Sequence, residues 1–176
     1  LTAAQYQLTG ATVNANLGAG SLFNIGGDST LTGTAAAGSV SVQAGTLALG
    51  ASDRLADTAT VSVSSGATLN LNGFSDTVGL AVLNGSLAGT GTLTAAQYQL
   101  TGATVNANLG AGNLVNFGGT STLNGTAAAG SVSLQAGTLS LGASNRLADT
   151  ATVSVSAGAT LNLNGFSDTV GLAVLN

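Results

Sequence analysis

Apolar and polar residues alternate over short stretches of the chain, and glycine-containing turns separate these stretches. In the clearest case, the alternating segments 39–42 and 46–49 flank the turn at 43–45. Period-two alternation predicts half-buried β-strands, and glycine favours the tight bends between them. The same pattern returns at 60–63 and 68–71, about 21 residues later. We interpret this spacing as one coil of a β-solenoid.

A longer repeat is superimposed on this pattern. Residues 1–84 match residues 93–176 at an offset of 92, and nine of the 84 aligned positions differ. Weaker versions of the strand pattern predict about five coils in each 92-residue unit. We therefore expect an all-β chain that folds as a right-handed parallel β-helix. Unit 1 spans 1–92, and an incomplete unit 2 spans 93–176 and stacks continuously on unit 1.

Alternation also predicts which side chains fill the interior. In each strand the aliphatic residues share one face, whereas Ser, Thr and Asn share the other. We expect the aliphatic residues to stack on their counterparts in the coils above and below. The predicted interior residues are Val40, Val42, Leu47, Leu49, Val61, Val63, Leu69 and Leu71.

Composition narrows the classes of function. The chain contains two Arg and six Asp, with a formal net charge of −4, and neither His nor Cys. No basic patch is available for a phosphate backbone, so we expect no nucleic-acid partner. No apolar run approaches the roughly 20 residues that cross a bilayer, so we expect no membrane insertion of this segment. Because most catalytic and ligating residue types are missing, we expect no enzyme, no catalytic residue and no cofactor.

The aspartates are the one exception to this scarcity. Clustered aspartates serve some β-helical enzymes that cleave acidic polysaccharides, and Asp53, Asp57 and Asp76 lie close in sequence. However, Asp53 becomes Asn145 in unit 2, and no second cluster replaces it. The chain also lacks the Gly-Gly-x-Gly-x-Asp repeat of secreted calcium-binding solenoids, so we expect no metal site.

Each unit has one charged phrase that is a candidate for surface contact. Arg54 and Asp57 lie three residues apart, and they recur as Arg146 and Asp149. We expect a local salt bridge in a loop, which contributes little to stability. The alternative is a ladder of charged ridges, one per unit, that contacts a saccharide or a neighbouring filament.

The two phenols are the other candidates for surface contact. We expect Tyr6 and Tyr98 to occupy packed strand positions, although exposed rings would offer a platform on which a sugar could stack. Two asparagines accompany the apolar Leu-Asn-Leu strand of each unit, and we expect all four to form amide ladders or to bond a turn backbone: Asn70, Asn72, Asn162 and Asn164. A flat ice-binding face would require threonine-rich phrases that recur at coil spacing. The threonine-rich phrases of this chain do not recur in this way.

The phrases at 91–95 (Gly-Thr-Leu-Thr-Ala), 39–49 and 65–73 resemble the β-strand repeats of autotransporter passengers and filamentous-haemagglutinin-like adhesins. The resemblance extends over the whole chain. It implies a right-handed parallel β-helix in a surface or released protein of a Gram-negative bacterium, acting in attachment, aggregation or biofilm formation. It implies no catalytic residue.

We therefore expect a structural repeat segment of a large secreted bacterial surface adhesin, forming a rod or fibre at the cell surface or in the extracellular matrix. The expected partners are further copies of the same repeat, and beyond them neighbouring filaments or extracellular polysaccharide. A carbohydrate-binding β-helix module is the main alternative. A polysaccharide-active enzyme and an ice-binding solenoid are weaker alternatives.

Overall fold

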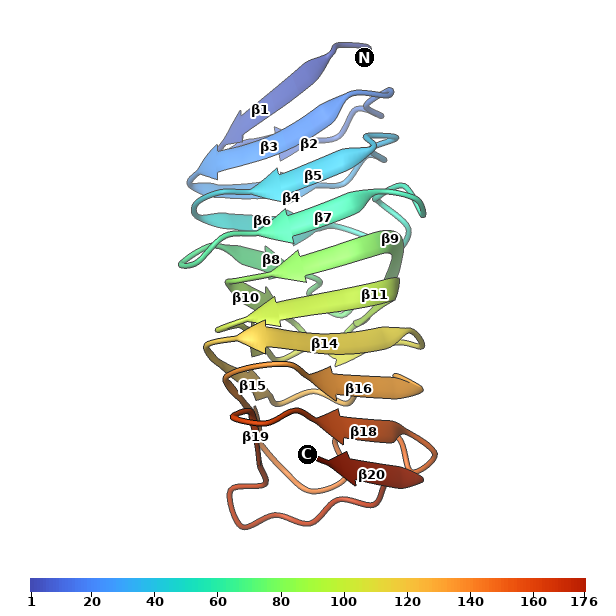
Figure 1. Ribbon diagram of the computed structural model, residues 1–176. Helices are drawn as coiled ribbons and strands as arrows, with labels where there is room; N and C mark the ends of the chain where they lie inside the picture. Colours follow the sequence, from blue (N-terminus) through green and yellow to red (C-terminus); the bar gives the residue numbers. More distant parts are fainter.

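The computed structural model describes residues 1–176 as a parallel β-solenoid of about ten turns (Figure 1). The termini lie toward opposite ends of the stack, and each coil adds one strand to each of two long sheets. The predicted fold class, an all-β parallel solenoid, is confirmed. No helix in the structure is long and apolar enough to cross a bilayer.

The first sheet runs the whole length of the stack. Its order along the stack is β1 (Gln5–Thr9), β3 (Ser21–Gly26), β5 (Ser39–Val42), β7 (Thr60–Val63), β9 (Asp76–Leu83), β11 (Thr92–Thr101), β14 (Asn113–Gly118), β16 (Ser131–Leu134), β18 (Thr152–Val155) and β20 (Leu172–Leu175). One further strand, β13 (Asn108–Leu109), pairs with β11 beside this path. All of these pairings are parallel, as a solenoid requires.

The second sheet lies behind the first in Figure 1 and has shorter strands. Its order is β2 (Thr12–Val13), β4 (Asp28–Leu31), β6 (Thr46–Leu49), β8 (Thr68–Asn70), β10 (Ser86–Ala88), β12 (Thr104–Val105), β15 (Thr120–Leu123), β17 (Thr138–Leu141) and β19 (Thr160–Asn162). The strands expected at 39–42, 46–49 and 60–63 are confirmed to the residue.

The register of the first sheet gives the length of each coil. Tyr6 pairs with Leu22, Leu22 with Val40, Val40 with Val61, Val61 with Ala81 and Ala81 with Tyr98. Successive coils therefore take 16, 18, 21, 20 and 17 residues. Five coils lead from Tyr6 to its counterpart Tyr98, which confirms the expected number per unit. The 21-residue spacing seen in the sequence belongs to one coil in each unit, because the turns differ in length.

A single apolar core runs the length of the stack. All eight predicted interior residues are at most 1% exposed, and they belong to one continuous cluster with six of their equivalents in unit 2. The other two equivalents lie in the last coil, where Leu161 is partly buried against the cluster and Leu163 is exposed. Stacking of Val on Val and Leu on Leu buries aliphatic surface along the whole axis, and this burial is the main stabilising contribution. The core passes through the boundary between the units, because β9 pairs directly with β11.

The inward phase changes once within β9. Asp76 and Val78 point inward, but after Gly79 the inward residues are Ala81 and Leu83. The amides of Gly79 and Leu80 both donate to the carbonyl of Ala59, at 2.9 and 3.3 Å, which marks the extra residue of a bulge. The apolar Leu80 therefore points outward.

Candidate functional sites

Arg54 is fixed by backbone carbonyls, and it does not form the expected salt bridge with Asp57. The guanidinium Nε donates to the carbonyl of Ser52 at 2.8 Å, and Nη1 donates to that of Thr32 at 2.9 Å. Asp57 is exposed two positions beyond Leu55. Because Thr32 lies one coil earlier, the arginine ties two coils together.

Unit 2 repeats this arrangement around Arg146. The guanidinium Nε donates to Ser144 at 3.0 Å, and Nη1 donates to the carbonyl of Asn124 at 2.9 Å. Asp149 is exposed, like its equivalent in unit 1. The two exposed aspartates, Asp57 and Asp149, therefore lie on the same side of the rod, one per unit.

Asp76 is a buried carboxylate whose role the sequence did not indicate. Its exposed fraction is 2%, and Oδ2 accepts hydrogen bonds from the backbone amides of Arg54 at 2.7 Å and Leu55 at 3.1 Å. Oδ1 is buried without a hydrogen-bond partner. Desolvation raises the pKa of this carboxyl above its ordinary 3.8, outweighing the amide bonds, and the nearby Asp53 raises it further.

The place of Asp76 in the solenoid explains why a carboxylate is there. On a third side of the coils, single parallel β-pairs connect inward residues of successive coils. Leu17 pairs with Ala35, and Ala35 pairs with Leu55, so these residues form a column. The amide of Ala35 donates to the carbonyl of Arg54 in the next coil. The amide of Leu55 has Asp76 Oδ2 as its acceptor, so the side chain substitutes for a backbone carbonyl. Asp76 therefore links its own coil to the preceding one by hydrogen bonds.

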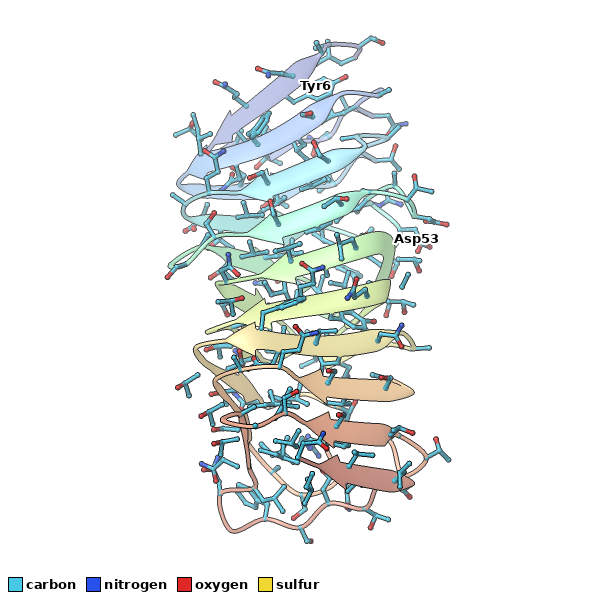
Figure 2. The ribbon with its side chains drawn as sticks, viewed as in Figure 1. Tyr6 and Asp53 are labelled. Atoms are coloured by element: carbon cyan, nitrogen blue, oxygen red, sulfur yellow. The ribbon has the colours of Figure 1, made fainter.

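Asp168 makes the same contacts at the C-terminal end of the stack. Its Oδ2 accepts from the amides of Arg146 at 2.6 Å and Leu147 at 3.2 Å, and its Oδ1 is also buried and unpartnered. Asp53 and its equivalent Asn145 both have positive φ angles, of 55° and 54°. Asp and Asn both tolerate this left-handed conformation, which explains the exchange. Figure 2 shows Asp53 at the outer edge of its coil.

Both tyrosines are buried, so the expected packed positions are confirmed and neither ring can serve as a sugar-stacking platform. Tyr98 is fully buried and Tyr6 is 6% exposed at the N-terminal end (Figure 2). The Tyr98 hydroxyl accepts from the amide of Ala95 and donates to the carbonyl of Leu93, both at 2.9 Å. Burial raises the pKa of the Tyr98 phenol above 10.0. Each tyrosine hydroxyl therefore links two backbone groups that lie three and five residues before it in the chain.

The polar residues on either side of Leu71, Asn70 and Asn72, hydrogen-bond the backbone of a turn. This is one of the two roles expected for them from the sequence. Asn70 Oδ1 accepts from the amide of Asn72 at 2.8 Å, and Asn72 Nδ2 donates to the carbonyl of Leu49 at 2.8 Å. Asn72 has a positive φ of 54°. Asn162 and Asn164 repeat these contacts in unit 2.

Two fully buried asparagines were missed in the sequence. Asn24 donates to the carbonyl of Ala44 at 2.7 Å, and its equivalent Asn116 donates to that of Ala136 at 2.8 Å. Asn116 also accepts from the Ser121 hydroxyl at 2.7 Å. The available signal was the strand phase, because Asn24 follows the inward Leu22 by two positions. These amides bind the turn of the following coil.

The surface has one cleft, and it lies where the units meet. It is lined by the turn and strand residues Ser65, Gly66, Ala67, Thr68, Asn84, Gly85, Ser86, Gly102 and Thr104. The lining is almost wholly hydroxyl, amide and backbone. None of the aspartates lines this cleft, and no three His, Cys, Asp or Glu side chains gather anywhere in the chain. A pair of carboxylates flanking a substrate cleft, as glycoside hydrolysis needs, is absent.

Comparison with known proteins found no matching family model, no matching curated protein and no matching solved structure. The structure is a β-solenoid in which the polar side chains of Arg54, Asp76 and Asn72 all form hydrogen bonds with the backbone. The chemistry available at its surface is that of hydroxyls, amides and isolated carboxylates.

Proposed function

We propose that the chain is a structural repeat segment of a large secreted bacterial surface adhesin. In this role it forms part of a rod or fibre used in cell attachment, aggregation or biofilm matrix. Its function is mechanical: a stack of coils holds other parts of the adhesin at a distance, and nearly identical units allow many weak contacts to act together. The partners are further copies of the repeat and, laterally, neighbouring filaments or extracellular polysaccharide.

One observation carries this proposal: a 92-residue unit is a whole number of coils. Because five coils lead from Tyr6 to Tyr98, each added unit lengthens the rod and presents the same faces in the same order. A unit of fractional coils would break the inward phase at every boundary. A sequence under selection for length can therefore duplicate without a new folding problem.

The distribution of polar groups supports the same role. The arginines, Asp76 and the tyrosines bond backbone within or between coils, so most of the polar chemistry stabilises the rod. The outward strand positions are mainly Ser and Thr, which carry no charge and need no specific partner. We propose no catalytic residue, cofactor or metal.

Antibodies raised against the purified chain test the location and the role together. Immunogold labelling of the producing bacterium should decorate fibres at the cell surface or in the matrix. Removing the segment from the gene should reduce aggregation and attachment, whereas restoring one whole 92-residue unit should recover part of the activity. A strain with the restored unit shortened by half a coil is the matched control, because its phase is broken. Label confined to the cell interior would overturn the proposal.

A second candidate is carbohydrate binding at the cleft between the units, which is favoured by its hydroxyl and amide lining. Glycan-array binding by the purified chain, lost on Thr68→Val, would support it. Thr160→Val is the control, since Thr160 is the unit 2 equivalent of Thr68 and does not line the cleft. No binding to any glycan would exclude this candidate and leave the structural role.

A further inference from the structure

Each unit exposes one large apolar side chain on the outer face of the first sheet. Ile25 in β3 and its equivalent Phe117 in β14 are each 43% exposed. The other large apolar side chains that are exposed lie at residue 1 or in the last coil, from residue 163 onward. Ile25 and Phe117 are therefore the two that the body of the stack presents to solvent, one in each unit.

A β-bulge accompanies this exposure in both units. The register of β1 on β3 passes from Asn24 to Gly26, and it leaves Ile25 without a partner in the preceding coil. The register of β11 on β14 skips Phe117 in the same way. The extra residue of a bulge is released from the ladder, and its side chain is re-aimed relative to the regular alternation of the strand. The bulge therefore directs an apolar side chain outward at the same place in each unit.

The units differ most around this strand, yet its outward positions stay apolar. Five of the nine differences between the units fall within residues 21–32. Among them, Phe23 becomes Val115 and Ile25 becomes Phe117, so each unit keeps one phenylalanine and one aliphatic residue there. The outward positions of β5 and β7 are Ser and Thr instead. The pair Phe23 and Ile25 and the pair Val115 and Phe117 are called the bulge patches below.

We infer that the bulge patches bind the bulge patches of a second copy of this chain, with the two rods side by side and their first sheets facing. The first sheet is the one in front in Figure 1. The inference rests on the proposed function, because it assigns a surface to the contact between neighbouring filaments. The same surface serves on both copies, so the contact is self-complementary.

The spacing of the patches favours a second copy as the partner. Five coils separate the two patches, which corresponds to about 24 Å along the rod at the usual distance between strands. A second copy carries its patches at the same spacing, so both patches of one rod meet both patches of the other at once. Each further unit would add one more patch in the same position, and the contacts would strengthen one another.

The absence of charge on this face also favours a second copy. The chain has a formal net charge of −4, so two copies repel each other wherever their charges face. The strands of the first sheet carry one charged residue, Asp76, and its side chain points inward. The charge nearest in sequence to a bulge patch is Asp28, which becomes Thr120 in unit 2. Two copies can therefore approach through this sheet without bringing outward charges of its strands together.

Uncharged amides border each bulge patch. Gln7 lies one coil before the patch of unit 1 and Gln43 one coil after it, and Gln99 and Gln135 are their equivalents in unit 2. An apolar centre with a polar rim is typical of protein interfaces. A side-chain amide both donates and accepts, so glutamines of two copies can bond each other. A platform for stacking sugars would need an aromatic ring at the exposed position of each unit, but Ile25 offers none.

Adding a charge at both bulge patches tests the contact. The double variant Ile25→Asp, Phe117→Asp would bring carboxylates of two copies together, so association should weaken by at least about 100-fold. Thr12→Asp with Thr104→Asp is the matched control, because it adds the same two charges at exposed, equivalent positions of the second sheet. Sedimentation velocity at concentrations up to about 1 mM measures association. Circular dichroism checks that each variant keeps its β structure.

Two further variants make the result independent of one substitution. Ile25→Ser with Phe117→Ser removes apolar surface without adding charge, and association should weaken by at least about tenfold. Ile25→Lys with Phe117→Lys should be monomeric alone, like the aspartate variant. An equimolar mixture of the lysine and aspartate variants should form dimers that added salt weakens, because opposite charges then face each other. Equal spacing of the patches makes this true for parallel and antiparallel rods.

Three results would overturn the inference. Wild type that stays monomeric up to the highest concentration would show that the patches do not associate. Association that persists in the aspartate variant, or that the control variant loses equally, would place the contact elsewhere. A mixture of the two charged variants that stays monomeric would show that patch does not face patch. The proposed adhesin role is judged separately, by its own labelling and deletion experiment.

Discussion

Asp76 pairs with Leu93 across the boundary between the two units, in a column that aliphatic residues fill in every other coil except the last, where Asp168 takes the same place. Asp76 Oδ2 bonds the amides of Arg54 and Leu55 in the preceding coil, whereas Oδ1 is buried without a partner. The carboxylate therefore joins its own coil to the preceding one, and the backbone of Asp76 pairs with the following coil. It also brings an ionisable group into the core, which makes the stability of the rod depend on pH.

Replacing Asp76 by Asn should reduce this pH dependence. The pKa of Asp76 is raised in the folded chain, so the folded state binds the proton more tightly than the unfolded state does. The contribution of this group to stability is full below the ordinary pKa of 3.8 and is lost as pH rises through the folded pKa. Asparagine keeps an acceptor for the two amides and carries no charge. Relative to wild type, Asp76→Asn should therefore become more favourable toward neutral pH.

Urea unfolding followed by circular dichroism at acidic and neutral pH measures this difference. Asp57→Asn is the control, because the Asp57 side chain is exposed and bonds no buried amide. An Asp76→Asn variant whose stability relative to wild type is the same at both pH values would contradict the prediction.

Replacing Arg54 by Ala should destabilise the chain by about 1–2 kcal/mol, because two charge-assisted bonds to backbone carbonyls are lost. Asp57→Ala should change stability by less than about 0.5 kcal/mol, as at an ordinary surface position. Chemical denaturation of both variants gives the comparison. A salt bridge between the two residues would instead give similar losses for both, reduced by added salt.

Much of the fold could be predicted because alternation and repetition are strong signals here. Val40 and Val42 repeat as Val61 and Val63, and a period of two admits only one inward face. The lengths of the other coils could not be predicted. A coil has no fixed length, and the turns between strands lack a shared sequence.

The special polar positions were less predictable. Arg54 and Asp57 are close in sequence, which favoured a local ion pair, but the guanidinium reaches a carbonyl 22 residues earlier. Asp76 looked like one of a loose group of acidic residues. Only the three-dimensional column that places it between Leu55 and Leu93 shows that it replaces a backbone acceptor. Such long-range bonds leave no local pattern.

Replacing Tyr98 by Phe should cost about 1–3 kcal/mol, because the buried amide of Ala95 would lose its acceptor. Tyr6→Phe removes the same bond to Ala3 at the N-terminal end, where Ala3 is half-buried and water can replace the hydroxyl. Its cost should be smaller. The two variants have the same local sequence, so thermal unfolding of each isolates the effect of burial. Equal losses would show that the hydroxyl is as accessible in the middle of the rod as at its end.

Substitution by alanine should have opposite effects on stability at two glycines of unit 2. The backbone of one glycine lies close to the preceding coil, and the backbone of the other does not. A Cβ at Gly125 would collide with the carbonyls of Ala107 and Asn106 in the preceding coil, so Gly125→Ala should destabilise by about 1–3 kcal/mol. A Cβ at Gly130 would meet nothing within 4 Å, and its φ is not positive. Gly130→Ala should therefore stabilise by about 0.4–1 kcal/mol, by restricting the unfolded chain. Urea unfolding of both variants measures the two signs, and a neutral Gly125→Ala would mean that adjacent coils are spaced more widely than the register of β15 on β12 implies.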